Sequence, residues 1–518
     1  MNASFYTSVI ILGCFACFIM VVATLGNVTL PKEKRDLFLS IFVSVAAGSL
    51  FEWGAKMLDG IGGAASFAIV ALKLCEFILS PSIAVLYAAV FNQSMRDKHL
   101  VYAYKALAAF KPDLVVLETK TPVVKRHWAW IERHAKNEAR KDGGSGAPEP
   151  RPKDFVKFLL VGDHVTALPQ ESIEKPGVWA VIPGGDWDYG LLDYIAAGCP
   201  RGVQPFALRE SLKDAPWIDR DLVHWELYAK KNGNFRRTPG TYIMSGRDCW
   251  HGKCTFCSWT TLYPKYRTRD PIDVVDEIEM LVTKYGVKEI MDDSGSFPVG
   301  SWLTTFCNEM IRRGLPKKVR LDCNMRFGRL GLDDYRLMRK AGFQFVLFGV
   351  ESANQETLDR FNKALKVEDV EKGARWATEA GLDVHVTFMF GHAWEGPKEM
   401  ANTVRLARRL LAKGWAKTLQ CTLTIPYPGT PLFKELEAND GLTTKDWDEY
   451  DMRRAITKTP LATEDEIKCA IREVYRGFLQ PGALWHRLTT TRTLFDFGFY
   501  YRGVRSLIGH LMDFRSSK

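Results

Sequence analysis

The sequence predicts an α/β chain in which a partial barrel of six βα units follows a smaller α/β domain and an apolar N-terminal region. Three observations lead to this prediction. From Thr241 onward, β-rich runs alternate with amphipathic helical patterns for about 180 residues, as in parallel sheets whose strands are joined by helices. Before them, residues 101–205 contain short apolar runs typical of buried strands. The chain carries no charged residue before Lys32.

Residues 1–95 are predicted to form a transmembrane region of about three helices. Ser8–Leu25 is long enough to cross the hydrocarbon core of a bilayer, and two further apolar runs cover Leu37–Phe51 and Ile61–Phe91. Basic residues lie between the first two runs and after the last one. Loops rich in lysine and arginine stay in the cytoplasm, so three spans with the N-terminus outside would place both basic segments there. We therefore expect a multi-pass protein of the cell membrane with a cytoplasmic catalytic part. The alternative is that these runs are buried helices of a soluble domain.

Residues 101–205 predict part of an α/β domain. Its strands are expected at Pro112–Leu117, Phe155–Val161 and Val178–Ile182, each followed by a glycine, threonine or proline turn. The charged segment 206–239 is predicted to be a solvated linker. Its basic cluster Lys230–Arg237 contains a single aromatic residue, Phe235, which is little support for base stacking, so no nucleic-acid partner is expected.

Residues 240–430 predict the barrel, and residues 431–518 predict a helical C-terminal extension. The helix after the first strand should begin at Asp270-Pro271, an N-cap and N1 pair. Thr463 and Glu466 have the spacing of a capping box in the extension. The strands and helices between are expected at Val287–Met291, Ser301–Arg313, Val319–Cys323, Leu332–Ala341, Gln344–Val350, Val367–Ala380, Val384–Phe390, Pro397–Ala412 and Leu419–Ile425.

Three cysteines, Cys249, Cys254 and Cys257, lie within nine residues of the loop after the first barrel strand. Thiols at this spacing indicate one soft metal centre. Two kinds of site fit: a closed zinc site with His251 as the fourth ligand, and an iron–sulfur cluster with three cysteine ligands and one open iron. A zinc ribbon would not continue into alternating strands and helices, whereas α/β barrels place their chemistry in the loops after the strands. The context therefore favours the cluster.

The cysteine loop, with Phe256 before its last cysteine, and the βα units after it resemble the radical S-adenosylmethionine superfamily. The resemblance implies a partial (βα)6 barrel preceded by a Rossmann-like cobalamin-binding domain, which is truncated here because its opening βα unit is missing. The family usually places three residues between its first two cysteines, and this chain has four. The motifs that resemble the cobalamin-binding branch are Asp292–Phe297, Gly349–Gln355, Phe390–His392 and Pro426–Pro431.

The resemblance also implies cofactors and contacts. A [4Fe–4S] cluster would be held by Cys249, Cys254 and Cys257, and S-adenosylmethionine would chelate the open iron. For Asp293 the alternative role is a helix N-cap, and for Glu351 it is a structural ion pair. The residues expected to contact S-adenosylmethionine are Phe256, Asp293, Ser294, Glu351 and Ser352.

Cobalamin is the second cofactor that the resemblance implies. Its contacts would be Gly162, Thr166 and Gly185, in the loops Val161–Thr166 and Pro183–Asp186. The chain lacks the Asp-x-His-x-x-Gly motif that supplies a histidine below the cobalt in some other cobalamin proteins. His164 is therefore expected to be a loop or packing residue.

The expected function is that of a membrane-attached radical S-adenosylmethionine enzyme of the methyltransferase or cyclase type, which cleaves S-adenosylmethionine reductively for C–H functionalisation. The alternatives are a cobalamin-free radical enzyme and a membrane sensor or fusion protein with an inactive catalytic half. The expected partners are the membrane and an electron donor such as flavodoxin or ferredoxin. The sequence indicates neither the substrate nor the residues that act on it.

Overall fold

The computed structural model describes residues 112–141, 156–222, 225–231 and 235–490. The chain divides into two compact units, Met1–Pro112 and Asp113–Lys518, and the description concerns the second. Residues 1–95, where the transmembrane helices are predicted, lie outside the described residues. Among the described helices, none combines the length and the apolar character that crossing a bilayer requires.

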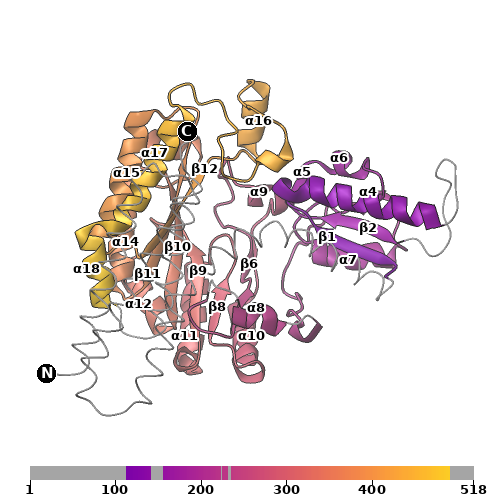
Figure 1. Cartoon of the computed structure of the whole chain (residues 1–518). Coiled ribbons are helices and arrows are strands. Elements are labelled where there is room, and N and C mark those ends of the chain that lie inside the picture. Colours follow the sequence, from indigo (N-terminus) through magenta and orange to yellow (C-terminus); the bar gives the residue numbers. More distant parts are fainter. Residues whose placement is uncertain (1–111, 142–155, 223–224, 232–234, 491–518) are drawn as a thin grey trace, which may run out of the picture. The chain divides into compact units, whose positions relative to one another are not determined.

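Six parallel strands form the main sheet, in the order β12-β11-β10-β9-β8-β5. Figure 1 labels β8, β9, β10, β11 and β12. Each strand lies beside its predecessor along the barrel, which is the arrangement of a series of βα units. Among the described strands, β5 and β12 form the two edges, so the barrel is partial, as predicted. The strands are β5 (Gly240–Ile243), β8 (Glu289–Asp292), β9 (Arg320–Met325), β10 (Phe343–Glu351), β11 (Asp383–Phe390) and β12 (Thr418–Leu423).

Amphipathic helices connect these strands and bury one face each. Asp270 caps the first of them as predicted, because its side chain accepts a hydrogen bond from the Ile272 amide at 2.8 Å. Two short helices were not predicted: α9 (Trp259–Leu262) and α13 (Gln355–Arg360). The connecting helices are α10 (Pro271–Lys284), α11 (Ser301–Arg312), α12 (Leu332–Lys340), α14 (Val367–Glu379) and α15 (Pro397–Ala412).

Three further helices follow the barrel: α16 (Pro431–Ala438), α17 (Glu464–Arg476) and α18 (Pro481–Thr490). The predicted capping box is confirmed at the start of α17. The Thr463 amide donates to the Glu466 carboxylate at 2.8 Å, and the Glu466 amide donates to the Thr463 hydroxyl at 3.3 Å. The apolar face of α17 packs on α15, so this part of the extension covers the barrel.

The smaller domain contains four parallel strands in the order β1-β2-β3-β4. Its first three strands lie within two residues of the predicted ranges. The fourth strand was not predicted, because a strand of two residues is too short to show an apolar or alternating pattern. The strands are β1 (Leu114–Glu118), β2 (Lys157–Val161), β3 (Val178–Val181) and β4 (Gly202–Val203), and the helices are α4 (Val124–Lys141), α5 (Asp163–Ala167), α6 (Pro169–Ile173) and α7 (Trp187–Ala196).

The segment after this domain differs from the solvated linker that its charge pattern predicts. It contains a short 3-10 helix, Arg220–Leu222, and α8 (Trp225–Lys231). Arg220 is only 3% exposed and pairs with the buried Glu277 of α10 at 3.3 Å. The segment is therefore in part packed against the barrel.

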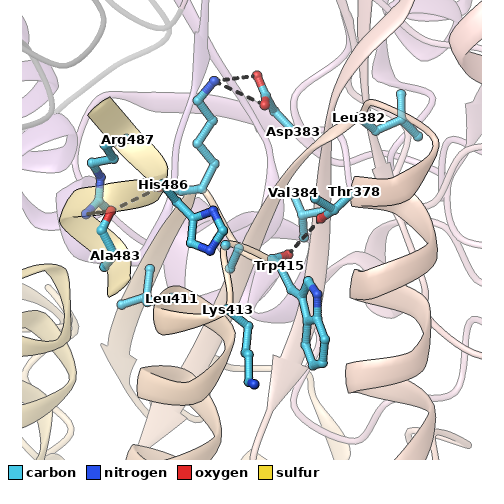
Figure 2. Close-up of a pocket in the computed structure, with 13 residues that line it drawn as sticks. Thr378, Leu382, Asp383, Val384, Leu411, Lys413, Trp415, Ala483, His486 and Arg487 are labelled. Carbon is cyan, nitrogen blue, oxygen red and sulfur yellow. Dashed lines mark hydrogen bonds and ion pairs between the residues drawn. The ribbon is translucent and has the colours of Figure 1, made fainter. Parts of the chain in front are cut away.

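A pocket lies at the amino ends of β11 and β12 (Figure 2). Asp383 accepts hydrogen bonds from Lys417 at 3.0 and 3.1 Å, and the Thr378 hydroxyl donates to the Trp415 carbonyl at 3.4 Å. The cysteine loop follows the carboxyl end of β5. Because the strands are parallel, this pocket is at the opposite end of the barrel from the predicted site.

Candidate active site

The cysteine loop is held at both ends and in its middle. A two-residue antiparallel pair, β6 (Gly246–Arg247) with β7 (Arg267–Thr268), closes its base. In the loop the Thr255 amide donates to the Phe361 carbonyl at 3.0 Å, and the Thr255 carbonyl accepts from the Leu432 amide at 2.9 Å. Segments far apart in the sequence thus fix the loop at the carboxyl end of the barrel.

The four residues between Cys249 and Cys254 are accommodated by side-chain contacts. Trp250 lies 5.3 Å from the guanidinium carbon of Arg326 and 5.3 Å from that of Arg329. Nε2 of His251 lies 2.7 Å from the Asn362 carbonyl oxygen and therefore donates to it. The longer spacing thus forms a packed bulge.

Cys254 is buried, whereas Cys249 and Cys257 are half-buried. Burial raises the pKa of Cys254, although nearby Lys363 and Arg326 lower it in part. Burial also raises the pKa of Cys257 to about 12, and the neighbouring Cys254 and Cys249 contribute in the same direction. Within the described part of the chain, no three His, Cys, Asp or Glu side chains are arranged as a metal site. A set of three thiols nevertheless suits an iron–sulfur cluster in which one iron has no protein ligand. Cysteine binds such a cluster as the thiolate, so cluster binding would deprotonate these thiols.

The end of β8 is tied to the base of the loop. Asp292 is buried and accepts hydrogen bonds from the Ser245 amide at 3.0 Å and the Ser294 amide at 3.1 Å. Ser294 in turn accepts from the Gly246 amide at 2.9 Å. Of the two residues predicted here, Ser294 is engaged inside the protein and Asp293 is exposed. The N-cap alternative for Asp293 is wrong, since α11 begins at Ser301.

Asp248, immediately before the first cysteine, was missed in the sequence. It is 2% exposed, and one carboxylate oxygen accepts from the Gly295 amide. The other oxygen is buried without a partner among the described residues. Burial raises the pKa of Asp248 to about 7, and the charges of Asp293 and Asp292 add to the shift.

Glu351, at the end of β10, forms the ion pair that was its alternative role. Its carboxylate lies 2.6 Å from Nζ of Lys363, and both side chains are buried. The backbone of Glu351 has φ = 72°, a region that non-glycine residues seldom occupy and that is typical of functional sites. Lys363 also lies 5.6 Å from the ring centre of Phe256, which packs against Phe361. The predicted Phe256 and Glu351 are thus joined through one lysine.

Ser352 is engaged in a buried hydrogen-bond network. Its hydroxyl donates to Glu395 at 2.7 Å, and Glu395 also accepts from Thr357 at 2.6 Å and from Asn354 at 3.0 Å. This network fixes the turn between β10 and α13. Ser352 therefore shapes the loop in this structure.

His392, after β11, is the second buried group that sequence analysis did not assign. Nδ1 lies 2.7 Å from the Thr424 hydroxyl, and Nε2 has no partner among the described residues. Burial lowers the pKa of His392, although Glu395 and Glu351 act in the opposite direction. The ring stacks on Trp394. A neutral imidazole with one unused nitrogen thus lies near Glu351.

In the smaller domain, the three residues predicted to contact cobalamin shape two loops. The Thr166 hydroxyl donates to the Gly162 carbonyl at 2.6 Å and accepts from the Gly184 amide at 2.9 Å. A Cβ atom at Gly162 would lie 2.6 Å from the Thr119 carbonyl oxygen. A Cβ atom at Gly185 would lie 2.1 Å from the ring of Tyr263, which belongs to the segment after α9. The glycines are thus required by close contacts within the protein.

The loop that contains Gly185, here called the glycine loop, is joined to the cysteine loop by ion pairs of the buried Asp186. Asp186 accepts hydrogen bonds from Arg247 at 2.8 Å, from the Arg209 amide at 2.6 Å and from Arg267. Burial alone would raise the pKa of Asp186, but these donors together lower it. Arg247 is two residues from Cys249. The smaller domain thereby contacts the base of the cysteine loop directly.

His164 is fully buried between the rings of Trp128 and Trp447, at centroid distances of 5.5 and 5.3 Å. Nδ1 lies 3.3 Å from the Thr121 hydroxyl, and Nε2 lies 3.5 Å from the Glu171 carboxylate. These contacts agree with its expected role as a packing residue.

Comparison with known proteins supports the assignment from the cysteine loop. The family model "Radical SAM superfamily" matches residues 243–407. The anaerobic magnesium-protoporphyrin IX monomethyl ester cyclase of Cereibacter sphaeroides is 34% identical over 352 residues, which are 63% of this chain and 56% of that protein. The chain thus spans only about half of that relative. The cyclase of the same name from Rubrivivax gelatinosus is 30% identical over 403 residues, 73% of this chain and 67% of that protein.

A solved structure shares the fold over most of this chain. The radical S-adenosylmethionine methyltransferase TsrM from Kitasatospora setae, with cobalamin and a [4Fe–4S] cluster bound, superposes with a TM-score of 0.54 and 16% identity. The match covers 80% of this chain and 92% of that chain. At this identity it establishes a shared fold. Together with the family match and the two cyclases, it places this chain in the radical S-adenosylmethionine superfamily of enzymes.

Proposed function

We propose that this enzyme functionalises an unactivated C–H bond by methyl transfer or cyclisation, with cobalamin as its second cofactor. The observation that carries the proposal is the buried contact between the glycine loop of the smaller domain and the base of the cysteine loop, through Asp186, Arg247 and Arg267. A cofactor in the smaller domain and a cluster at the barrel would then lie on adjoining loops.

Cys249, Cys254 and Cys257 are the proposed ligands of the [4Fe–4S] cluster. A cluster held by these three thiolates would have one iron to which the amino and carboxylate groups of S-adenosylmethionine could bind. When bound, the cluster supplies the electron that splits the sulfonium and yields a deoxyadenosyl radical. The protein's part is to bind and orient. Phe256 packs against Phe361, Asp293 is exposed after β8, and the buried Glu351 lies beside Lys363.

Cobalamin would lie at the carboxyl ends of the smaller domain's strands. Thr119, directly after β1, has a buried hydroxyl without a partner among the described residues, which a bound ligand could engage. Thr166 and Gly162 hold the neighbouring loop, and Gly185 brings the next one against Tyr263. His164 is taken up by packing, so the cobalt is proposed to have no histidine ligand below it.

The remaining parts of the proposal concern location and partners. The apolar runs of residues 1–95 would attach the enzyme to the cell membrane, with the catalytic part in the cytoplasm. A one-electron donor such as flavodoxin or ferredoxin would reduce the cluster. The names of the related cyclases favour a tetrapyrrole among the substrate classes that the sequence leaves open, namely lipid, tetrapyrrole, peptide and small metabolite.

Anaerobic reconstitution of the full-length protein tests the proposal. Absorption and electron paramagnetic resonance spectra should report one [4Fe–4S] cluster, and equilibrium dialysis with hydroxocobalamin should give stoichiometric binding. Reduction in the presence of S-adenosylmethionine should release methionine with 5′-deoxyadenosine, together with S-adenosylhomocysteine if methyl transfer occurs. A cluster without cobalamin binding would favour the cobalamin-free enzyme. Stoichiometric zinc without iron would exclude both.

A further inference from the structure

Arg326 differs from the other strongly buried arginines of the described chain in having no carboxylate partner there. It follows β9 directly and is 9% exposed. By contrast, Arg220 pairs with Glu277, Arg267 with Asp186, and Arg269 with Glu277. A guanidinium stays charged in proteins, and burying it without an opposite charge costs several kcal/mol.

The contacts of Arg326 lead to the cysteine loop. Nη1 lies 3.7 Å from Sγ of Cys254, Nη2 donates to the Lys363 carbonyl, and the guanidinium plane lies over Trp250. Nε has no partner among the described residues. The side chain is thus held on two sides and directs one donor at a proposed cluster ligand.

Among the described residues, the second buried cation near Cys254 is Lys363, and its charge is already neutralised. Lys363 forms its ion pair with Glu351 at 2.6 Å. The uncompensated positive charge beside the thiol is therefore that of Arg326. A cluster bound through thiolates carries negative charge, and hydrogen bonds to its sulfur atoms help to set its reduction potential.

We propose that Arg326 is a positioning residue that supplies the counter-charge of the cluster, donates to Sγ of Cys254 and thereby raises the cluster's reduction potential. Reduction adds negative charge to the cluster, so a fixed donor at a ligand sulfur stabilises the reduced form more than the oxidised one. This inference rests on the proposed cysteine ligand set.

Arg329 provides a matched control in the same loop. Its guanidinium carbon lies at the same 5.3 Å from the Trp250 ring, but its side chain is exposed and it forms no hydrogen bond with a cysteine of the described chain. Arg329→Gln removes the same charge from the same tryptophan and leaves the contact with Cys254 in place. Arg326→Gln removes the buried charge, while Arg326→Lys keeps a charge on a side chain that cannot bond the sulfur and the Lys363 carbonyl with a planar fork.

The experiment is a redox titration of the reconstituted full-length protein without S-adenosylmethionine, monitored by electron paramagnetic resonance, with iron content measured in parallel. For Arg326→Gln we expect the reduced-to-oxidised ratio at a fixed potential to fall about tenfold, equivalent to about 59 mV for one electron. Arg326→Lys should give a smaller fall in the same direction. Arg329→Gln should change the ratio by less than about twofold, since an exposed charge is screened.

Several results would overturn the inference. An unchanged potential in Arg326→Gln is one, and an equal shift in Arg329→Gln is another. If Arg326→Gln retains no iron, the test is the reduction potential of Arg326→Lys. A wild-type potential in Arg326→Lys then contradicts the proposal. A wild-type potential with weakened S-adenosylmethionine binding would assign Arg326 to the carboxylate of that cofactor instead. Retention of a full cluster in Cys254→Ala would refute the ligand set, whereas its loss alongside a wild-type potential in Arg326→Gln would refute this inference alone.

Discussion

The two ends of the barrel differ in the partners of their cationic side chains. At the amino end, Arg236 and Lys417 both pair with Asp383, and Glu289 accepts from the Arg236 and Arg237 amides at 3.0 and 2.8 Å. At the carboxyl end, Arg326 has a thiol as its nearest acidic group, and Nε2 of His392 has no partner among the described residues. Asp383 thus neutralises two cations at the amino end, whereas at the carboxyl end Arg326 has no carboxylate partner among the described residues, which leaves charge and hydrogen-bonding capacity for cofactors. Four predictions test this contrast.

The largest effect is expected at the cysteine loop. Cys249→Ala, Cys254→Ala and Cys257→Ala should each abolish the cluster, because the proposed site has three ligands and the other metal-binding side chain of the loop, His251, is engaged with the Asn362 carbonyl. Iron and sulfide analysis after anaerobic reconstitution measures the loss. Cys469→Ala is the control, since Cys469 is exposed on α17 and should leave the iron content unchanged. Full iron content in any of the three loop variants would show that the ligand set is wrong.

Lys363→Met should cost the free energy of unfolding about 3–5 kcal/mol, because it leaves Glu351 buried without its cation. Urea denaturation of the apo-protein measures this loss. Adding Glu351→Gln should restore a large part of it, since the double variant no longer contains the unpaired charge. Additive losses in the double variant would mean that the pair is not coupled as its 2.6 Å separation indicates.

Asp186→Asn should lower the free energy of unfolding by about 3 kcal/mol near neutral pH. It should also change how that free energy falls as the solution is acidified. The lowered pKa of Asp186 means that its carboxylate stabilises the folded state above the ordinary aspartate value of 3.8. That stabilisation is lost as the pH falls through the lower folded-state pKa. The variant should therefore lose less stability than the wild type on acidification, as measured by unfolding midpoints between about pH 7 and pH 3.

The control for Asp186→Asn is Asp188→Asn. Asp188 also pairs with Arg247, but its side chain is 43% exposed, so solvent screens the interaction. Asp188→Asn should therefore cost much less free energy of unfolding near neutral pH than Asp186→Asn. An equal cost in the two variants would assign the effect to Arg247 in general.

The smallest effect is expected at the amino end of the barrel. Asp383→Asn removes a carboxylate that is 28% exposed and shared by two cations, and should cost about 1 kcal/mol. Cluster content and reduction potential should stay at wild-type values, because this end does not contact the cysteine loop. A changed potential in this variant would show that the two ends of the barrel are not independent.

Much of the fold could be predicted because hydrophobic period and helix caps are local signals. The barrel strands, the capped start of α10 and the capping box of α17 all appear within a few residues of their predicted positions. The cysteine loop was readable for the same reason. Arg326, Lys363 and His392 were not, because each follows a different strand or helix and only the folded barrel brings it near the loop. The available signal for Arg326 would have been an arginine directly after a barrel strand, here β9.

The hydrogen-bond partners of individual serine hydroxyls could not be predicted from the sequence either. Ser294 and Ser352 were placed in the correct loops, but their hydrogen bonds to Gly246 and Glu395 depend on backbone positions more than 40 residues away. Whether they also contact S-adenosylmethionine stays a prediction. The same holds for Gly162, Thr166 and Gly185 toward cobalamin.

The contact between Gly185 and Tyr263 has a consequence for how such chains diverge and can be recombined. The Tyr263 ring fills the space that any side chain at position 185 would need, and its hydroxyl donates to the Gly185 carbonyl at 3.2 Å. Among homologues, a larger residue at 185 should therefore be accompanied by a smaller one at 263. A chimera that exchanges the smaller domain between two relatives should accordingly function only when residues 259–263 are exchanged with it.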